Sequence, residues 1–119
     1  MNIISPLVQF HSQLRIFHWQ TDSFAKHKAY GKAYEGLDGL IDTFVETYMG
    51  IYGRNKPNIT FSISIKSLQS DSVSDTVIED FLNYLKELRT FVAKDTDLQN
   101  LVDSIAGEVN QLKYRLSLN

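Results

Sequence analysis

The sequence predicts an all-α protein, a bundle of four helices with one long connection between the second and third. Apolar residues recur every three to four positions along four segments, as on the buried face of a helix. The segment between the second and third of these shows a different pattern. The hydrophobic content of 43% and charged content of 22% are typical of a globular domain. We therefore treat residues 1–119 as one domain.

The composition and charge of the chain argue against several classes of function. The net charge of −2 argues against a general nucleic-acid binder, which is usually basic. The chain has no cysteine, so disulfides and thiolate metal sites are excluded. No window is apolar enough to span a membrane, and the N-terminus does not resemble a signal peptide. We expect a cytoplasmic protein that does not associate with membranes.

The first helix is expected over about residues 5–20. Ser5 followed by Pro6 is typical of an N-cap and the first helical position. Thr21, Asp22 and Ser23 supply the turn and cap of a second helix. Because only scattered glycines interrupt its pattern, this helix is expected to be long, over residues 24–52.

The connection over residues 53–73 differs in kind. Gly53, Asn55, Pro57 and Asn58 end the second helix, and Ile59, Phe61, Ile63 and Ile65 then alternate with polar residues. A lone strand has no partner in a helical protein, so we expect an extended crossover packed on the bundle. It is long enough to let the second and third helices run parallel. Alternatively, it could pair with its own symmetry mate.

The third and fourth helices are expected over residues 74–94 and 97–117. Ser74 is a candidate cap for the third, and Thr96 with Gln99 form a candidate capping box for the fourth. Four helices with one long middle connection predict a ferritin-like or a plain four-helix bundle.

The second helix carries a polar stripe beside its apolar face. Its members are His27, Gly31, Glu35, Asp38, Asp42 and Glu46. Asp42 and Glu46 lie one turn apart, so their carboxylates can reach a common ion. A solvent-exposed face usually mixes lysine with such acids, yet no basic residue occurs between Glu35 and Gly53.

Spacing constrains how these groups could share a metal ion. His27 and Asp42 are separated by roughly 22 Å along a helix that rises 1.5 Å per residue. A single copy of the helix therefore cannot bring both to one ion. A second, antiparallel copy related by a two-fold axis can bring His27 of one chain to Asp42 and Glu46 of the other.

These residues resemble the signature of the starvation-type miniferritins, the Dps proteins of the ferritin-like superfamily. The first helix of that family carries a His-Trp pair, here His18-Trp19. Its second helix carries a histidine and, fifteen residues later, an Asp-x-x-x-Glu motif, here His27 followed by Asp42 and Glu46. The closing helix, 97–117, is similar too.

The resemblance implies a function. His18, His27, Asp42 and Glu46 would bind iron at a dimer interface, with no catalytic residue beyond these ligands and no organic cofactor. Fe(II) would be oxidised, usually by hydrogen peroxide, and stored in a hollow dodecamer. Trp19 would stand beside the site to take up stray oxidising equivalents.

The sequence also departs from the family. Gly31 occupies the position of a family aspartate that acts as a bridging ligand, and the turn between His18 and His27 is shorter than usual. No lysine-rich N-terminal tail is present, so we do not expect DNA binding. The chain reads as a short, divergent member of a kind that phage genomes could also encode.

Other interpretations stay open. Asp42 and Glu46 could form a solvated acidic stripe or pair with Arg15, Arg54 or Arg89. A histidine beside an apolar face usually has a structural role, which we expect for His11, and we expect Trp19 to serve in packing. Glu108 is expected to be a structural hydrogen-bond partner. The alternative function is a non-enzymatic assembly protein with a degenerate ferritin-like bundle.

Overall fold

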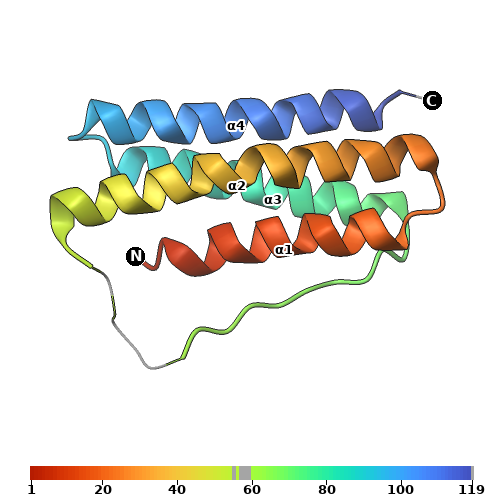
Figure 1. Ribbon diagram of the computed structural model, residues 1–119, viewed down its shortest axis with the longest axis horizontal. Helices are drawn as coiled ribbons and strands as arrows, with labels where there is room; N and C mark the ends of the chain where they lie inside the picture. Colours follow the sequence, from red (N-terminus) through yellow and green to blue (C-terminus); the bar gives the residue numbers. More distant parts are fainter. Residues whose placement is uncertain (55, 57–59, 119) are drawn as a thin grey trace.

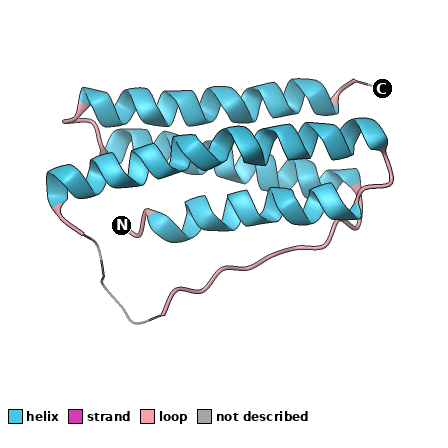
Figure 2. Ribbon diagram, in the orientation of Figure 1, coloured by secondary structure: helices cyan, strands magenta, loops and turns pink. Residues whose placement is uncertain are grey.

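Four helices form a bundle in the computed structural model, which describes residues 1–54, 56 and 60–118 (Figure 1). They are α1 (Ile4–Gln20), α2 (Phe24–Tyr52), α3 (Asp71–Phe91) and α4 (Thr96–Leu116). No strand occurs within the described residues (Figure 2). The prediction of an all-α four-helix bundle is confirmed. No described helix has an apolar stretch long enough to cross a membrane.

The long connection determines the topology. α1 and α4 run in one direction, and α2 and α3 run in the other (Figure 1). α2 packs against both α1 and α4, whereas α3 packs mainly against α4. Residues 60–70 run along the outer side of α1 to the start of α3. The expected parallel arrangement of the second and third helices is therefore confirmed.

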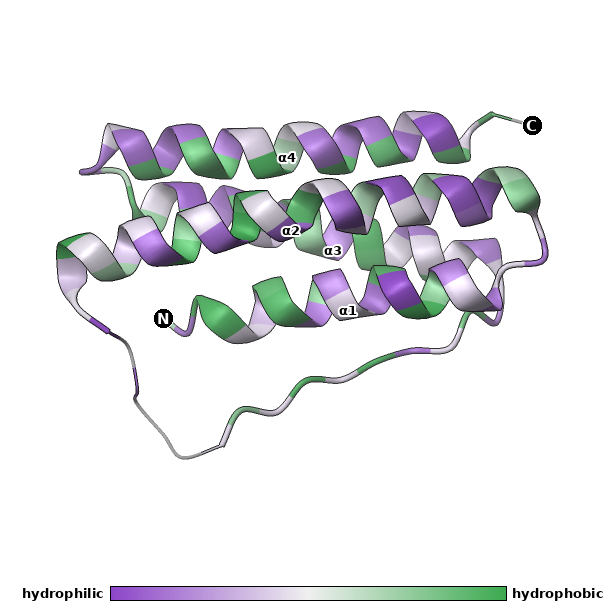
Figure 3. Cartoon of the chain, in the orientation of Figure 1, coloured by the Kyte–Doolittle hydropathy of each residue, from purple (hydrophilic) through white to green (hydrophobic). Residues whose placement is uncertain are grey.

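Apolar side chains from all four helices meet inside the bundle. In Figure 3, which colours the ribbon by hydropathy, hydrophobic residues recur along each helix. Burying each large aliphatic or aromatic side chain contributes about 1.5–3 kcal/mol. Phe10 of α1 and Phe81 of α3 stack with ring centroids 3.9 Å apart. The largest fully buried side chains are Tyr30, Phe17, Phe44, Ile3, Leu7, Leu14, Leu37, Ile78, Leu85, Leu88, Leu98 and Ile105.

The helix starts differ from the predicted caps at three of the four helices. Ser23 caps α2 as expected, since its hydroxyl accepts the N–H of Lys26 at 3.2 Å. At α1 the N-cap position is held by Ile3, and the side-chain oxygen of Asn2, one residue before it, accepts the N–H groups of Ile4 and Ser5 at 3.0 and 3.2 Å. The prediction of Ser5 as N-cap is wrong because Ser5 lies inside the first turn.

The predicted caps of α3 and α4 are also wrong, because both helices begin before the predicted positions. α3 begins at Asp71, so Ser74 is helical and buried, and its hydroxyl lies 2.6 Å from the Tyr30 hydroxyl of α2. The serine satisfies a buried polar group on a neighbouring helix. The predicted capping box of Thr96 and Gln99 is also absent, because Gln99 donates to the carbonyl of Arg89 at 3.4 Å.

Glutamines of α1 hold the crossover in place. Gln13 is only 2% exposed, and its amide both accepts the N–H of Lys66 and donates to its carbonyl, each at 2.7 Å. Gln9 accepts the N–H of Ser64 at 2.8 Å and Gln20 that of Leu68 at 2.6 Å. These amides bind an extended chain as a neighbouring strand would. The expected helix-ending Asn55, Pro57 and Asn58, and Ile59 of the alternation, lie outside the described residues.

Gln13→Ala should lower the free energy of unfolding by about 1–3 kcal/mol, since the Lys66 peptide loses both partners. Urea unfolding checks this value. Gln9→Ala is the matched control on the same helix and loses a single bond, so it should cost about 0.5–1 kcal/mol. Equal losses in the two variants would contradict a special role for Gln13.

Candidate metal centre

His18 and His27 meet where α1 turns into α2. His18 lies in the last turn of α1, and His27 lies in the first turns of α2, after the cap at Ser23. Their imidazoles stack with centroids 3.7 Å apart and planes inclined by 18°. Both residues are half-buried. The two histidines named from the sequence therefore form a single unit within one chain.

Each imidazole binds the other residue's backbone. Nδ1 of His18 lies 2.7 Å from the carbonyl oxygen of His27, and Nδ1 of His27 lies 2.7 Å from that of His18. A carbonyl only accepts, so both Nδ1 atoms carry a proton. In the neutral form each Nε2 then has a free lone pair, which is how metal-binding histidines are usually held. The bonds also satisfy a carbonyl at the end of α1.

Gly31 makes room for this arrangement. A Cβ atom at position 31 would lie 2.9 Å from Cε1 and 3.1 Å from Nδ1 of the His18 ring. No side chain fits there while His18 keeps its position. The His18 ring therefore occupies the space that an aspartate side chain at position 31 would need.

The pair lies in an open groove between the start of α2 and the end of α4, which Lys28, Lys32, Glu35 and Arg115 also line. Arg115 bonds Gln111 through Nη2 at 2.8 Å. Its Nη1 is buried without a hydrogen bond and lies 3.8 Å from a Glu108 oxygen.

Glu108 serves the packing of α4 on α2. A Cβ atom at Gly36 would lie 2.7 Å from one of its carboxylate oxygens, so the glycine lets this carboxylate approach α2 closely. Its partner is Arg115, through the ion pair just described. Glu108 has a structural role, but within the described residues it acts through an ion pair and a close contact and not through the expected hydrogen bond.

Asp42 and Glu46 lie exposed farther along α2. Neither makes an ion pair within the described part of the chain. Arg89 pairs with Asp103 at 2.8 Å, and the Arg15 guanidinium lies over the Tyr34 ring, 4.8 Å from its centroid. Among the described residues no cluster of three or more histidine, aspartate or glutamate side chains is arranged to hold a metal. The histidines and the acids thus remain separate within one chain.

The predictions for two residues near the site, His11 and Trp19, have different outcomes. His11 has the expected structural role, because its Nε2 lies 2.9 Å from the carbonyl oxygen of Tyr34. Trp19 was expected to pack, but its side chain is 65% exposed. The prediction for Trp19 is wrong because His18, not Trp19, faces α2 from this last turn of α1.

α2 has opposite charges at its two ends. Between Ser23 and Tyr34 it has three lysines and no acid, and Lys28 and Lys32 are exposed. From Glu35 onward it has four acids and no base, all exposed. The acidic residues of this helix were identified from the sequence. The lysines beside the histidines were not identified as part of the site, although they lie in the same stretch of sequence.

Gly31→Ala should lower the free energy of unfolding by about 1–3 kcal/mol, because the new methyl group overlaps the His18 ring. Chemical denaturation measures this change. Gly107→Ala is the control, since a Cβ there meets nothing within 4 Å. It should raise stability by about 0.5–1 kcal/mol through helix propensity. If Gly31→Ala instead raised the free energy of unfolding, the His18 ring would be free to move aside and the prediction would be wrong.

Comparison with known proteins gives four findings. The chain is 34% identical over 119 residues to an uncharacterized 14.6 kDa protein from the mobD-ri intergenic region of Enterobacteria phage T4, covering 98% of this chain and 83% of that protein. It is 22% identical over 110 residues to a DNA protection during starvation protein of Porphyromonas gingivalis, covering 90% of this chain and 69% of that protein. No solved structure gives a significant match. The model of a family of unknown function, DUF5856, matches residues 18–116, so the chain belongs to that family.

Proposed function

We propose that two copies of the chain together bind Fe(II) as a substrate and promote its oxidation, as a divergent miniferritin. His18 and His27 of one copy and Asp42 and Glu46 of the other would be the ligands. The observation that carries the proposal is the pair of Nδ1–carbonyl bonds of 2.7 Å, which hold both rings with Nε2 free. Imidazole nitrogen and carboxylate oxygen together suit iron in both oxidation states.

The reaction needs an oxidant, which we take to be hydrogen peroxide. Two Fe(II) ions each lose one electron, and the peroxide O–O bond breaks to give two hydroxide ions. The protein would supply ligands that bind the oxidised ion, so that it does not react further in solution. The purpose would be iron storage or protection from oxidation. The similarity to a protein named for DNA protection during starvation supports this purpose.

The charge of α2 supports a two-fold association. An antiparallel second copy places the lysine half of one helix against the acidic half of the other, and such complementarity favours association. It also supplies the partners that Asp42 and Glu46 lack in the single chain. Gly39 is exposed, and a Cβ there would meet nothing within 4 Å, so this stretch of the face has room for a neighbouring helix.

A second candidate function is assembly without iron chemistry. The groove beside the histidines also contains Lys28, Lys32 and Arg115. These cations could neutralise the acids of a second copy and take the role of a metal. In addition, Gly31 removes one family ligand. This candidate keeps the same two-fold association and predicts no iron binding.

Asp42→Asn with Glu46→Gln should abolish binding of Fe(II), on the order of one ion per chain in the unaltered protein. Anaerobic titration followed by hydrogen peroxide, read by near-ultraviolet absorbance of Fe(III), measures both steps. Asp75→Asn with Glu79→Gln is the matched control, since these α3 acids have the same spacing. A folded, associated wild-type protein that binds no iron would overturn the iron proposal and leave assembly.

Lys28→Glu should weaken self-association by about tenfold or more at low ionic strength, because it places an acid against the partner's acidic half. Adding Glu46→Lys to the same chain should restore much of the loss. Sedimentation velocity over a salt series measures both. Lys86→Glu on α3 is the control and should have no effect. An unchanged association in Lys28→Glu would contradict the antiparallel contact through α2.

A further inference from the structure

We propose that the outer edge of the crossover pairs with the same edge of a second copy, forming a two-stranded antiparallel ribbon. The outer edge consists of the backbone N–H and C=O groups of Phe61, Ile63 and Ile65. This contact is separate from the one proposed through α2. It rests on the backbone of the crossover and does not depend on iron binding.

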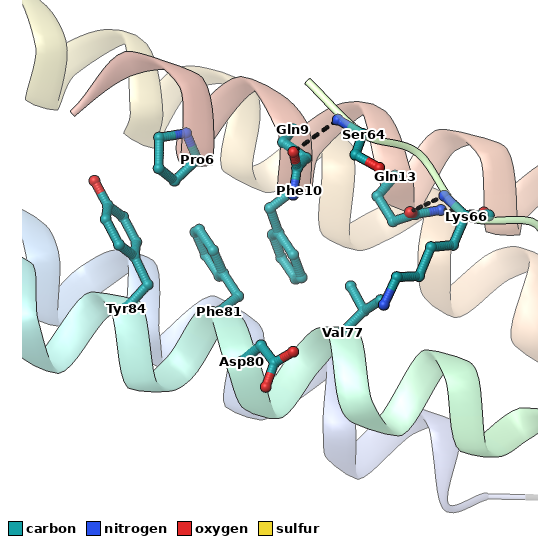
Figure 4. Close-up of a pocket in the computed structure, with 10 residues that line it drawn as sticks. All are labelled: Pro6, Gln9, Phe10, Gln13, Ser64, Lys66, Val77, Asp80, Phe81 and Tyr84. Atoms are coloured by element: carbon teal, nitrogen blue, oxygen red, sulfur yellow. Dashed lines mark hydrogen bonds between the residues drawn. The ribbon is translucent and has the colours of Figure 1, made fainter. Parts of the chain in front are cut away.

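The inner edge of the crossover is already occupied. Gln9 binds the N–H of Ser64, and Gln13 binds both the N–H and the carbonyl of Lys66 (Figure 4). In an extended chain, the backbone groups of successive residues point to opposite sides. The odd-numbered residues therefore direct their backbone groups away from α1.

The outer edge is unpaired and apolar. In the described part of the chain, no hydrogen bond involves the backbone of Phe61, Ile63 or Ile65. Their side chains are 45%, 41% and 38% exposed. Proteins usually protect such an edge with a lysine, a proline or a bulge. Residues 60–65 contain no charge and no proline, and the Lys66 side chain extends toward α3 (Figure 4).

The pattern of the edge matches a copy of itself. With Ile63 on the two-fold axis, it lies opposite the same residue of the partner, and Phe61 lies opposite the partner's Ile65. All three outward residues then exchange both backbone bonds, about six in total. Their side chains share one face of the ribbon, where apolar cross-strand pairs stabilise it. A shift of two residues that pairs Ile63 with the partner's Ile65 would place Phe61 opposite the polar Ser67 of the partner subunit.

The charges favour a second copy in the antiparallel direction. The uncharged stretch means that no like charges meet within the ribbon. Antiparallel pairing about Ile63 places Lys66 opposite the uncharged Thr60 of the partner subunit, since these residues lie three positions to either side of the axis. Parallel pairing would instead place Lys66 beside its own copy, which is unfavourable.

The ribbon and the proposed contact through α2 lie on different sides of α1. Gln9 and Gln13 face the crossover, whereas His11 and His18 face α2. The ribbon therefore leaves the histidine pair and the charged face of α2 free. A chain with two such self-matching surfaces associates beyond a dimer, because each copy can contact two others.

Residue-resolved hydrogen exchange of the intact protein tests the ribbon directly. The amides of Ile63 and Ile65 should gain at least tenfold protection as protein concentration rises through the range where the assembly forms. The Ser64 and Lys66 amides, bound by glutamines, should be protected throughout. Unprotected Ile63 and Ile65 amides in the assembled protein would overturn the proposal and leave this edge for a strand of another protein.

A pair of variants tests the same contact by mass. Ile63→Lys places two like charges opposite each other on the axis and should reduce the mass of the assembly at least twofold in light scattering. Ser62→Lys adds the same charge on the other face and should leave the mass unchanged. Iron binding through α2 should persist in both. An unchanged mass in Ile63→Lys would overturn the ribbon, whereas loss of iron binding in Asp42→Asn with Glu46→Gln bears only on the metal site.

Discussion

The turn between α1 and α2 is closed by two imidazoles that each bind the other's backbone carbonyl. Because both Nδ1 bonds are made at 2.7 Å, they fix the end of α1 against the start of α2 and fix both tautomers as well. The stacked rings leave no space beside His18 at position 31, where only glycine fits. The antiparallel pairing of the first two helices and the chemistry open to the histidines therefore depend on the same two bonds.

The fold was largely predictable because it depends on periodicity, which is a local property of the sequence. The helix starts were less predictable because they depend on contacts between segments. Ser74 has the residue type of a cap, yet its hydroxyl bonds Tyr30 from within α3. At α1 the Asn2 side chain binds the N–H groups of Ile4 and Ser5, a contact that the Ser5-Pro6 pattern did not indicate. In both cases the helix start depends on a polar group that lies outside the predicted cap.

The residues of the candidate site were proposed from the sequence, whereas their geometry could not be predicted. The spacing pointed to His27, Asp42 and Glu46 and required a second chain to bring them together, and the resemblance to the miniferritins added His18. It gave no sign that the two imidazoles stack, because this depends on the length of a three-residue turn. Gln13 was likewise missed: a buried glutamine beside Leu14 in a helix is a signal that a backbone needs partners nearby, and Lys66 supplies that backbone.

The acidic half of α2 has an unfavourable arrangement within one chain. Asp38, Asp42 and Glu46 follow one another at intervals of one turn, and each like-charge pair of this kind destabilises a helix by about 0.2–0.5 kcal/mol. The described ion pairs provide no compensation for Asp42 or Glu46. A cation or the lysines of a second copy would relieve the repulsion, and both act across the same antiparallel contact. The two cases differ in their use of the histidines: a bound cation would use the free Nε2 lone pairs, whereas an ionic contact between lysines and acids would not need them.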